Sequence, residues 1–199
     1  TEPDAPDHSA FSMVIVPTDT PGYTIVRETP VLGIRGGHCE VVYDDVRVPA
    51  DHLLGERGRG FVIAQERLGP GRIFHAMRWL GQAQRAFDLL CERLVSREAF
   101  GGPLASKQLM QQHVFDSYAQ IQACRLLTLH AAEAVDRGGD ARIEIGAVKV
   151  VGARMLHDVI DRAVQAHGAA GLTDDTPLRH MYRTARFARI YDGPDEVHI

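Results

Sequence analysis

The pattern of apolar and polar residues changes along the chain. Residues 11–17, 23–26 and 39–48 are short runs rich in β-branched residues, separated by Pro, Gly and Asp. Such runs are typical of strands joined by turns. From about residue 60, apolar residues instead recur every three or four positions, which is the period of an amphipathic helix. The pattern therefore predicts a β segment followed by helices.

The second part of the chain is predicted to form three long helices and a short one. Positions expected to face a shared core include Ile73, Met77, Leu80, Ala83, Phe87, Leu90 and Leu94 in the first helix, Val114, Tyr118, Ile121 and Cys124 in the second, and Val148, Val151, Met155, Val159 and Ala163 in the third. Breaks fall at 100–103, 137–140 and 167–171, and the short helix is expected from Pro177 to about Ile190. Short connections favour an antiparallel bundle. We expect a mainly α fold, with a four-helix bundle over residues 56–199 and a partial β-domain over residues 1–55.

Composition narrows the function classes. The 199 residues carry a formal charge of −4, which gives no reason to expect a nucleic-acid partner. Three scattered cysteines argue against a disulfide framework. No signal peptide or long apolar run is present, so we expect a protein without a membrane span. No Gly-rich nucleotide motif occurs, so a classical dinucleotide or P-loop site is not supported. The ligand spacing of a metal loop is also missing, so no metal is expected. The opening "TEPDAPDHSAF" lacks Met, and we expect a fragment of a longer protein.

The last segment, "RIYDGPDEVHI", places three acids around a Gly-Pro pair. One interpretation is a solvated tail. The other is a catalytic carboxylate held on a turn, because a carboxylate can act as a general base where it is well placed. The segment "HGAAG" at 167–171 is open in the same way, since Gly suits the end of an ordinary helix. Taken singly, these features leave both interpretations open.

The order of the motifs resembles that of the acyl-CoA dehydrogenase family. The ordered segments are "GRGF", "ERLGPGR", "GQAQRAFD", "SREAFGGPL", "AVQAHGAAGL", "PLRHMYR" and "RIYDGPDEVH". Upstream, "DDVRVPADHLLGE" is similar to the last part of the family's middle β-domain. "GPGR" followed by "DGPDEVH" is similar to the branch that in animals is fused to kinase-like domains.

The resemblance implies oxidation of an acyl-CoA thioester to a 2-enoyl-CoA, with FAD as the first electron acceptor. The family's base lies in a Tyr-acid-Gly sequence, which here places Asp192 as the α-proton base. Most family members carry Glu at this position, so Asp is a departure. Gly193 allows close approach of the substrate, and Gly71 and Arg72 match the substrate-proximal start of the first bundle helix.

The resemblance also implies a cofactor set and partners. The positions assigned to FAD contacts are Thr1, Arg97, Phe100, Lys107, Gln108, Gln165, Gly168, Ala169, Pro194 and Glu196. Arg97 and Phe100 match an Arg-x-x-Phe-Gly motif that contacts FAD across a subunit boundary. The implied partners are an acyl-CoA substrate, an electron-transfer flavoprotein, and further copies of the chain in a homodimer or homotetramer.

Three alternatives stay open at this point. A flavin oxidase of the same fold, similar to nitroalkane oxidase, also uses an Asp base at this position. A truncated paralogue could serve only as an oligomerisation or acyl-CoA-binding module, and an unrelated helical bundle would account for the periodicity alone. The expected location is the cytoplasm for a bacterial source, and the mitochondrion or peroxisome for a eukaryotic one.

Overall fold

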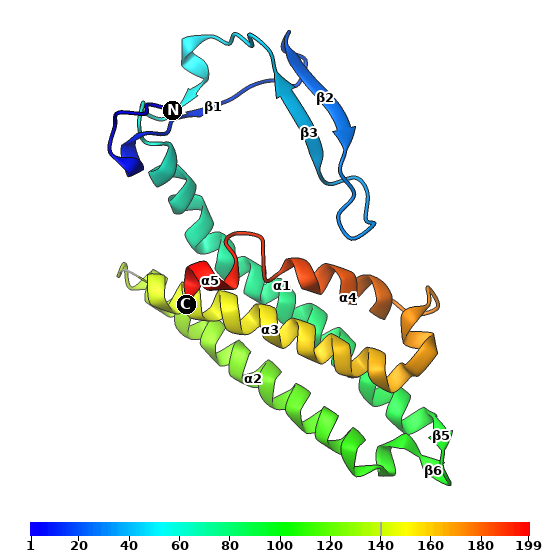
Figure 1. Ribbon diagram of the computed structural model, residues 1–199. Helices are drawn as coiled ribbons and strands as arrows, with labels where there is room; N and C mark the ends of the chain where they lie inside the picture. The colour runs from blue at the N-terminus through cyan, green and yellow to red at the C-terminus, as the bar shows by residue number, and fades with distance from the viewer. Residues whose placement is uncertain (140) are drawn as a thin grey trace. The chain divides into compact units, whose positions relative to one another are not determined.

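The computed structural model describes residues 1–139 and 141–199, which form two compact units, Thr1–Arg67 and Leu68–Ile199 (Figure 1). The mainly helical fold with short N-terminal strands confirms the predicted fold class. The expected domain boundary between residues 55 and 56 stays a prediction. Among the described residues, no helix is both long and apolar enough to cross a membrane.

The first unit contains two small antiparallel pairs of strands. β2 (Tyr23–Glu28) pairs with β3 (Cys39–Tyr43), and β1 (Met13–Val14) pairs with β4 (Leu53–Leu54). Two 3₁₀ turns, Asp7–Ser9 and Ala50–His52, complete the unit. Its strands bury no side chain fully, as expected for pairs of strands that have little sheet to pack against.

The second unit is a helical bundle. Its long helices are α1 (Gly60–Ser96, whose first two turns belong to the first unit), α2 (Gln108–Asp136) and α3 (Arg142–His167), followed by the shorter α4 (Leu178–Phe187) and α5 (Asp195–His198). A small hairpin of β5 (Glu98–Ala99) and β6 (Gly102–Pro103) and a 3₁₀ turn (Leu104–Ser106) join α1 to α2, and a second 3₁₀ turn (Gly168–Leu172) follows α3. Figure 1 shows α1, α2 and α3 running antiparallel to their neighbours in sequence.

Three helices meet at Gly152 on α3. A Cβ atom added there would lie 3.0 Å from the indole of Trp79 on α1 and 3.5 Å from Cys124 Sγ on α2. Trp79 and Cys124 are almost completely buried. The absence of a side chain at Gly152 therefore lets the indole pack directly against the α3 backbone.

Three of the residues predicted to face the core do not do so. Met77, Tyr118 and Val151 are exposed, with 56%, 56% and 42% of their surface accessible in this chain. The apolar stripe of each helix is wider than the strip that its neighbours cover, so periodicity alone does not find the edge of the core. The helix boundaries also differ: α1 begins at Gly60 and continues through Pro70, so Arg72 lies well inside it instead of at its start.

Candidate active site

The turn between α4 and α5 presents the Asp192 carboxylate from a constrained backbone. Asp192 has φ +55° and Gly193 has φ +101°, both in the left-handed region. A Cβ at Gly193 would lie 2.7 Å from His198 Nε2, so glycine is needed both for its φ and for space. A left-handed Asp persists only where surrounding contacts fix it, and such residues concentrate at functional sites.

The backbone of this turn is fixed by two side chains that contact the carbonyl oxygen of Asp192. Arg72 Nε on α1 donates to it at 3.0 Å, and His198 Nε2 on α5 donates to it at 3.2 Å. Burial lowers the pKa of His198, although this hydrogen bond raises it, so the neutral ring is favoured. The predicted Arg72 is thus brought to the predicted base, but it contacts the backbone and not the carboxylate.

The Asp192 carboxylate lies beside a cluster of aromatic rings. Its Oδ2 atom is 2.8 Å from His75 Nε2 on α1. The His75 ring lies against Trp79 and Tyr191, with centroids 5.8 and 4.8 Å away. Trp79 Nε1 donates a hydrogen bond of 2.7 Å to the Tyr191 hydroxyl, and burial raises the pKa of that phenol. The carboxylate therefore lies beside packed aromatic rings, with the charges of Arg72 and Lys149 close enough to interact with it.

Asp195 on the same turn is buried, with 1% of its surface exposed. Arg189 Nε and Arg154 Nε donate to its Oδ2 at 2.8 and 3.2 Å, and Lys149 Nζ lies 3.8 Å from Oδ1. Burial raises the pKa of this carboxyl, but the hydrogen bonds from the two arginines and the charges of Arg189 and Lys149 outweigh that effect and lower it. The interpretation of this segment as a solvated tail is wrong for Asp195, because the ion pairs offset the cost of burying its charge.

A pocket of about 340 Å³ opens beside the aromatic cluster. Its lining combines polar and apolar side chains from α1, α3, α4 and the turn: His75, Arg78, Trp79, Gln82, Leu156, Thr184, Phe187 and Tyr191. A concave site with a few polar groups next to a held carboxylate is the usual form of a small-molecule site. Asp192 and this pocket together form the candidate active site.

A second group of predicted residues lies where α1 ends and α3 ends. Arg97 and Phe100 are exposed, and Lys107 Nζ donates 2.9 Å to the Phe100 carbonyl. Arg93 donates 3.5 Å to the carbonyl of His167, which connects the end of α1 to the end of α3. Gln108, Gln165, Gly168 and Ala169 are also exposed, and Gly168 has φ +62° at the end of α3.

The two groups are far apart in one chain. At about 1.5 Å per residue, Arg72 and Arg93 lie roughly 30 Å apart along α1. Of the remaining candidates, Pro194 and Glu196 are exposed next to Asp192, Gly71 faces open space on α1, and Thr1 is exposed in the first unit. The roles assigned to all these residues stay predictions.

Sequence reasoning missed the residues that hold the turn. They come from α1, from α3 and from the segment after α4, and no local motif marks them: His75, Trp79, Lys149, Arg154 and Arg189. Arginines are frequent in this chain, so Arg154 and Arg189 do not stand out in the sequence, whereas only Lys107 and Lys149 are lysines. A buried lysine on an otherwise apolar helix face was the one available clue, since lysine is seldom buried without a partner.

Comparison with known proteins identifies the family. Residues 58–199 match the acyl-CoA dehydrogenase C-terminal domain. "Probable acyl-CoA dehydrogenase FadE2" of Mycobacterium tuberculosis is 55% identical over all of this chain, which spans 50% of that relative's length. The acyl-CoA dehydrogenase structure from Geobacillus kaustophilus is 29% identical with a TM-score of 0.92, covering all of this chain and 53% of its own. The chain belongs to the acyl-CoA dehydrogenase family.

Two further solved structures share this fold. A chain in the structure of the electron transferring flavoprotein of Acidaminococcus fermentans is 30% identical, with a TM-score of 0.86 over 96% of this chain and 50% of that one. PigA, solved with FAD and proline, is 20% identical with a TM-score of 0.90 over 96% of this chain and 50% of that one. At that identity the second likeness concerns the fold alone.

Proposed function

We propose that this chain is the C-terminal part of an acyl-CoA dehydrogenase in which Asp192 removes the α-proton of an acyl-CoA thioester. The observation that carries the proposal is the Asp192 carboxylate, held on a left-handed turn beside a pocket in a chain of this family. The reaction converts the thioester to a 2-enoyl-CoA by loss of the α-proton and of a hydride from the β-carbon.

Asp192 and the two side chains that hold it have separate roles in this chemistry. The Asp192 carboxylate accepts the α-proton and becomes a carboxylic acid. By the family's arrangement, the backbone N–H of Asp192 donates to the thioester carbonyl, on which negative charge develops. Arg72 and His198 fix the same residue through its carbonyl. This fixed geometry matters because an Asp side chain is one methylene shorter than the family's usual Glu, which leaves less freedom to correct a misplaced backbone.

The second group of residues fits FAD. The Arg97 guanidinium and the Lys107 ammonium lie at the end of α1 and the start of α2, and the left-handed Gly168 lies at the neighbouring end of α3. Guanidinium and backbone N–H groups are suited to a pyrophosphate. When bound, FAD supplies the acceptor for the β-hydride. Because this group lies roughly 30 Å from Arg72 along α1, its exposed residues are available to a flavin that belongs to another subunit.

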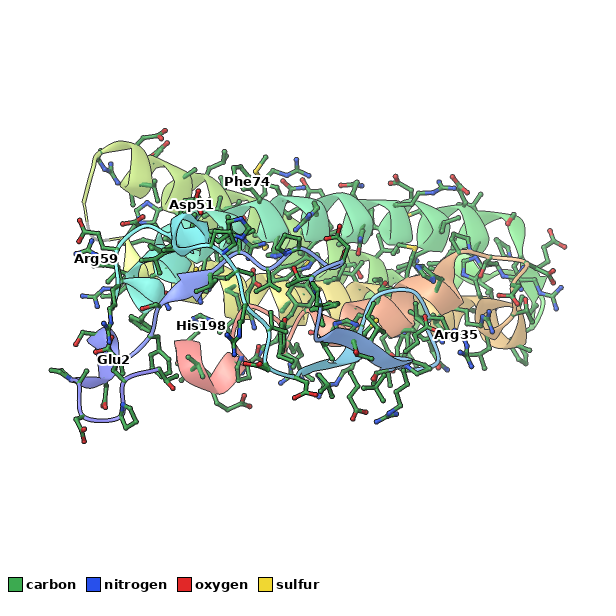
Figure 2. All side chains as sticks on the ribbon, turned by 90° about the horizontal axis from the view of Figure 1, so that it is seen from above. Glu2, Arg35, Asp51, Arg59, Phe74 and His198 are labelled. Atoms are coloured by element: carbon green, nitrogen blue, oxygen red, sulfur yellow. The ribbon has the colours of Figure 1, made fainter. Side chains whose placement is uncertain are left out.

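An exposed apolar stripe on α2 supports a homo-oligomer. Phe115, Tyr118, Leu126 and Leu129 recur at helical spacing on α2 and are 56–69% exposed in the single chain. They are separate from the buried stripe of α2, which contains Ile121 and Cys124. Phe74 on α1 also projects from the bundle (Figure 2) and is 60% exposed. We propose that a second copy of the chain covers these side chains, and that reduced flavin passes its electrons to an electron-transfer flavoprotein.

The proposal is tested with Asp192→Asn in the FAD-loaded protein. In the parent protein, anaerobic addition of acyl-CoAs of several chain lengths should bleach the flavin band with at least one of them. Asp192→Asn should retain FAD but lose about 10²–10⁴-fold in the rate of bleaching, and it should stop exchange of the α-proton of a bound thioester with solvent.

Asp175→Asn is the matched control, because Asp175 is an exposed acid outside the turn. It should bleach at the parent rate. Retained α-proton exchange in Asp192→Asn would remove Asp192 from the role of base. Rapid reaction of the reduced flavin with O₂ would instead identify a flavin oxidase, and a protein that binds no FAD would favour the non-catalytic module.

A further inference from the structure

Two adjoining pockets form a trough that begins beside Asp192 and runs between α1 and α4. The pocket of about 340 Å³ next to the aromatic cluster shares Arg78, Gln82 and Thr184 with a second pocket of about 500 Å³. The second pocket adds further lining residues: Gly81, Arg85, His180 and Met181. Resting on the proposed role of Asp192 as base, we propose that this trough holds the acyl chain of the substrate, and that the chain carries an anionic group which Arg78 binds.

The α1 wall of the trough is one face of that helix. Its polar residues recur at spacings of three and four, as neighbours on one side of a helix do: His75, Arg78, Gln82 and Arg85. Along the helix axis, Arg78 lies about 5 Å beyond His75, and Arg85 lies about 15 Å beyond it. Since His75 Nε2 is 2.8 Å from Asp192 Oδ2, the trough starts next to the proposed base and leads away from it.

The lining of the trough changes in character along its length. Trp79, Leu156 and Phe187 give the first pocket apolar surface, which methylene groups contact with a gain in free energy because they leave water. The second pocket contains the guanidiniums of Arg78 and Arg85. A methyl group placed against a guanidinium would displace its water without replacing the hydrogen bonds. The trough therefore fits a chain that is apolar near the thioester and polar further out.

The charge of the lining decides the sign of that polar group. The lining side chains that the structure describes include two guanidiniums and no carboxylate. One terminal nitrogen of Arg78 lies against the ring of His75, and the other N–H groups of this exposed guanidinium stay available to a ligand. A guanidinium can bind a carboxylate or a phosphate through two parallel N–H bonds. The lining therefore favours an anion over a methyl end.

The test compares acyl-CoAs of equal length that differ only at the far end of the chain. Hexanoyl-CoA ends in a methyl group and adipoyl-CoA ends in a carboxylate. In the FAD-loaded protein, adipoyl-CoA should bleach the flavin with a kcat/KM about 10–100-fold higher, which is the usual gain from a hydrogen bond to a charged group. A third acyl-CoA of this length that ends in a phosphate ester shows which of the two anions the trough prefers.

Two variants locate the anion along the trough. Arg78→Gln should abolish the preference for adipoyl-CoA over hexanoyl-CoA. Arg85→Gln should leave that preference in place and reduce the corresponding one for a twelve-carbon pair, because Arg85 lies about 15 Å along α1 from His75. Arg186→Gln is the matched control, since Arg186 is an exposed arginine of α4 that lines neither pocket. It should keep the parental preference for both pairs.

A second measurement does not depend on turnover. The 2-enoyl-CoA products of the two substrates can be titrated calorimetrically into the FAD-loaded protein. The product that ends in a carboxylate should bind about 10–100-fold more tightly than the one that ends in a methyl group. This advantage should shrink as the salt concentration rises, because salt screens the charge of an exposed guanidinium.

The outcomes separate this inference from the proposed function. Equal kcat/KM and equal product binding for the two chain ends would overturn the inference. So would an Arg78→Gln protein that loses the same factor with both substrates, because Arg78 would then not distinguish the chain ends. If hexanoyl-CoA bleaches the flavin at least as well as adipoyl-CoA, the proposed function stands without the anion site. If no acyl-CoA of either kind bleaches it, the proposed function fails and the inference falls with it.

Discussion

The two groups of candidate residues in the bundle differ in what holds them. The turn that carries Asp192 is fixed by its own chain: α1 supplies Arg72, α5 supplies His198, and Asp195 is paired with cations of α3 and the segment after α4. Roughly 30 Å along α1, Arg97 and Phe100 are exposed, and Phe100 keeps 91% of its surface accessible. The first group is held by contacts from within the bundle, whereas the second exposes its side chains on the surface of the single chain.

The largest effect on stability is expected from Asp195→Asn, which weakens the contacts that hold the turn carrying Asp192. The substitution keeps the size of the side chain but leaves Lys149, which is 1% exposed, without its negative partner. Removing one member of a buried ion pair costs about 3–5 kcal/mol in the free energy of unfolding. Chemical denaturation of the FAD-free protein measures this loss, and Asp175→Asn, which removes an exposed acid, should change the free energy by less than about 0.5 kcal/mol.

The same carboxyl predicts how stability changes with pH. Because the folded state lowers the pKa of Asp195, the unfolded state binds its proton at higher pH than the folded state does. The stabilisation from Asp195 is therefore complete above about pH 4 and is lost as pH falls through the lower folded value. A stability profile of Asp195→Asn that declines in acid as steeply as that of the parent would contradict this account.

In the second group of residues, Arg97→Ala should weaken the binding of FAD and leave the fold unchanged. The exposed guanidinium makes no ion pair among the described residues, so its loss should change the free energy of unfolding by less than about 0.5 kcal/mol. A charged hydrogen bond to a ligand is worth about 1.5–3 kcal/mol, which corresponds to roughly 10–100-fold weaker FAD binding. Chemical denaturation measures the first effect and titration with FAD measures the second. Light scattering follows the mass of the protein during the titration.

Arg137→Ala is the matched control, since Arg137 is an exposed arginine at the far end of α2. It should bind FAD like the parent. If Arg97→Ala binds FAD as tightly as this control, the second group of residues has no cofactor role. If FAD binding weakens only when the mass also falls, the flavin lies between two copies of the chain.

The sequence predicted the elements better than it predicted what fixes the site. Helical period and Gly-rich breaks locate α1, α2 and α3 because those signals are local. Asp192 and Gly193 were predicted as site residues because they lie together in a motif. His75 was not, since its contact with Asp192 joins residues 117 positions apart in the numbering. Likewise, Asp195 reads as a polar residue near the chain's last positions until α3 brings Lys149 and Arg154 to it.

The smallest expected effect tests how tightly the rings behind Asp192 are packed. A Cβ at Gly152 would press on the Trp79 indole at 3.0 Å, whereas a Cβ at Gly81 on α1 would meet no atom within 4 Å. Ala is favoured over Gly in a helix by about 1 kcal/mol, so Gly81→Ala should stabilise the protein by about 0.5–1 kcal/mol. In Gly152→Ala that gain is opposed by overpacking of about 1–3 kcal/mol, so we expect a net loss of up to about 2 kcal/mol.

Because Trp79 also donates a hydrogen bond to Tyr191, Gly152→Ala should lower the rate of flavin bleaching as well, while Gly81→Ala should not. If both variants are stabilised equally and react at the parent rate, the rings can move without displacing Asp192. The turn must then be held by Arg72, His198 and the ion pairs of Asp195.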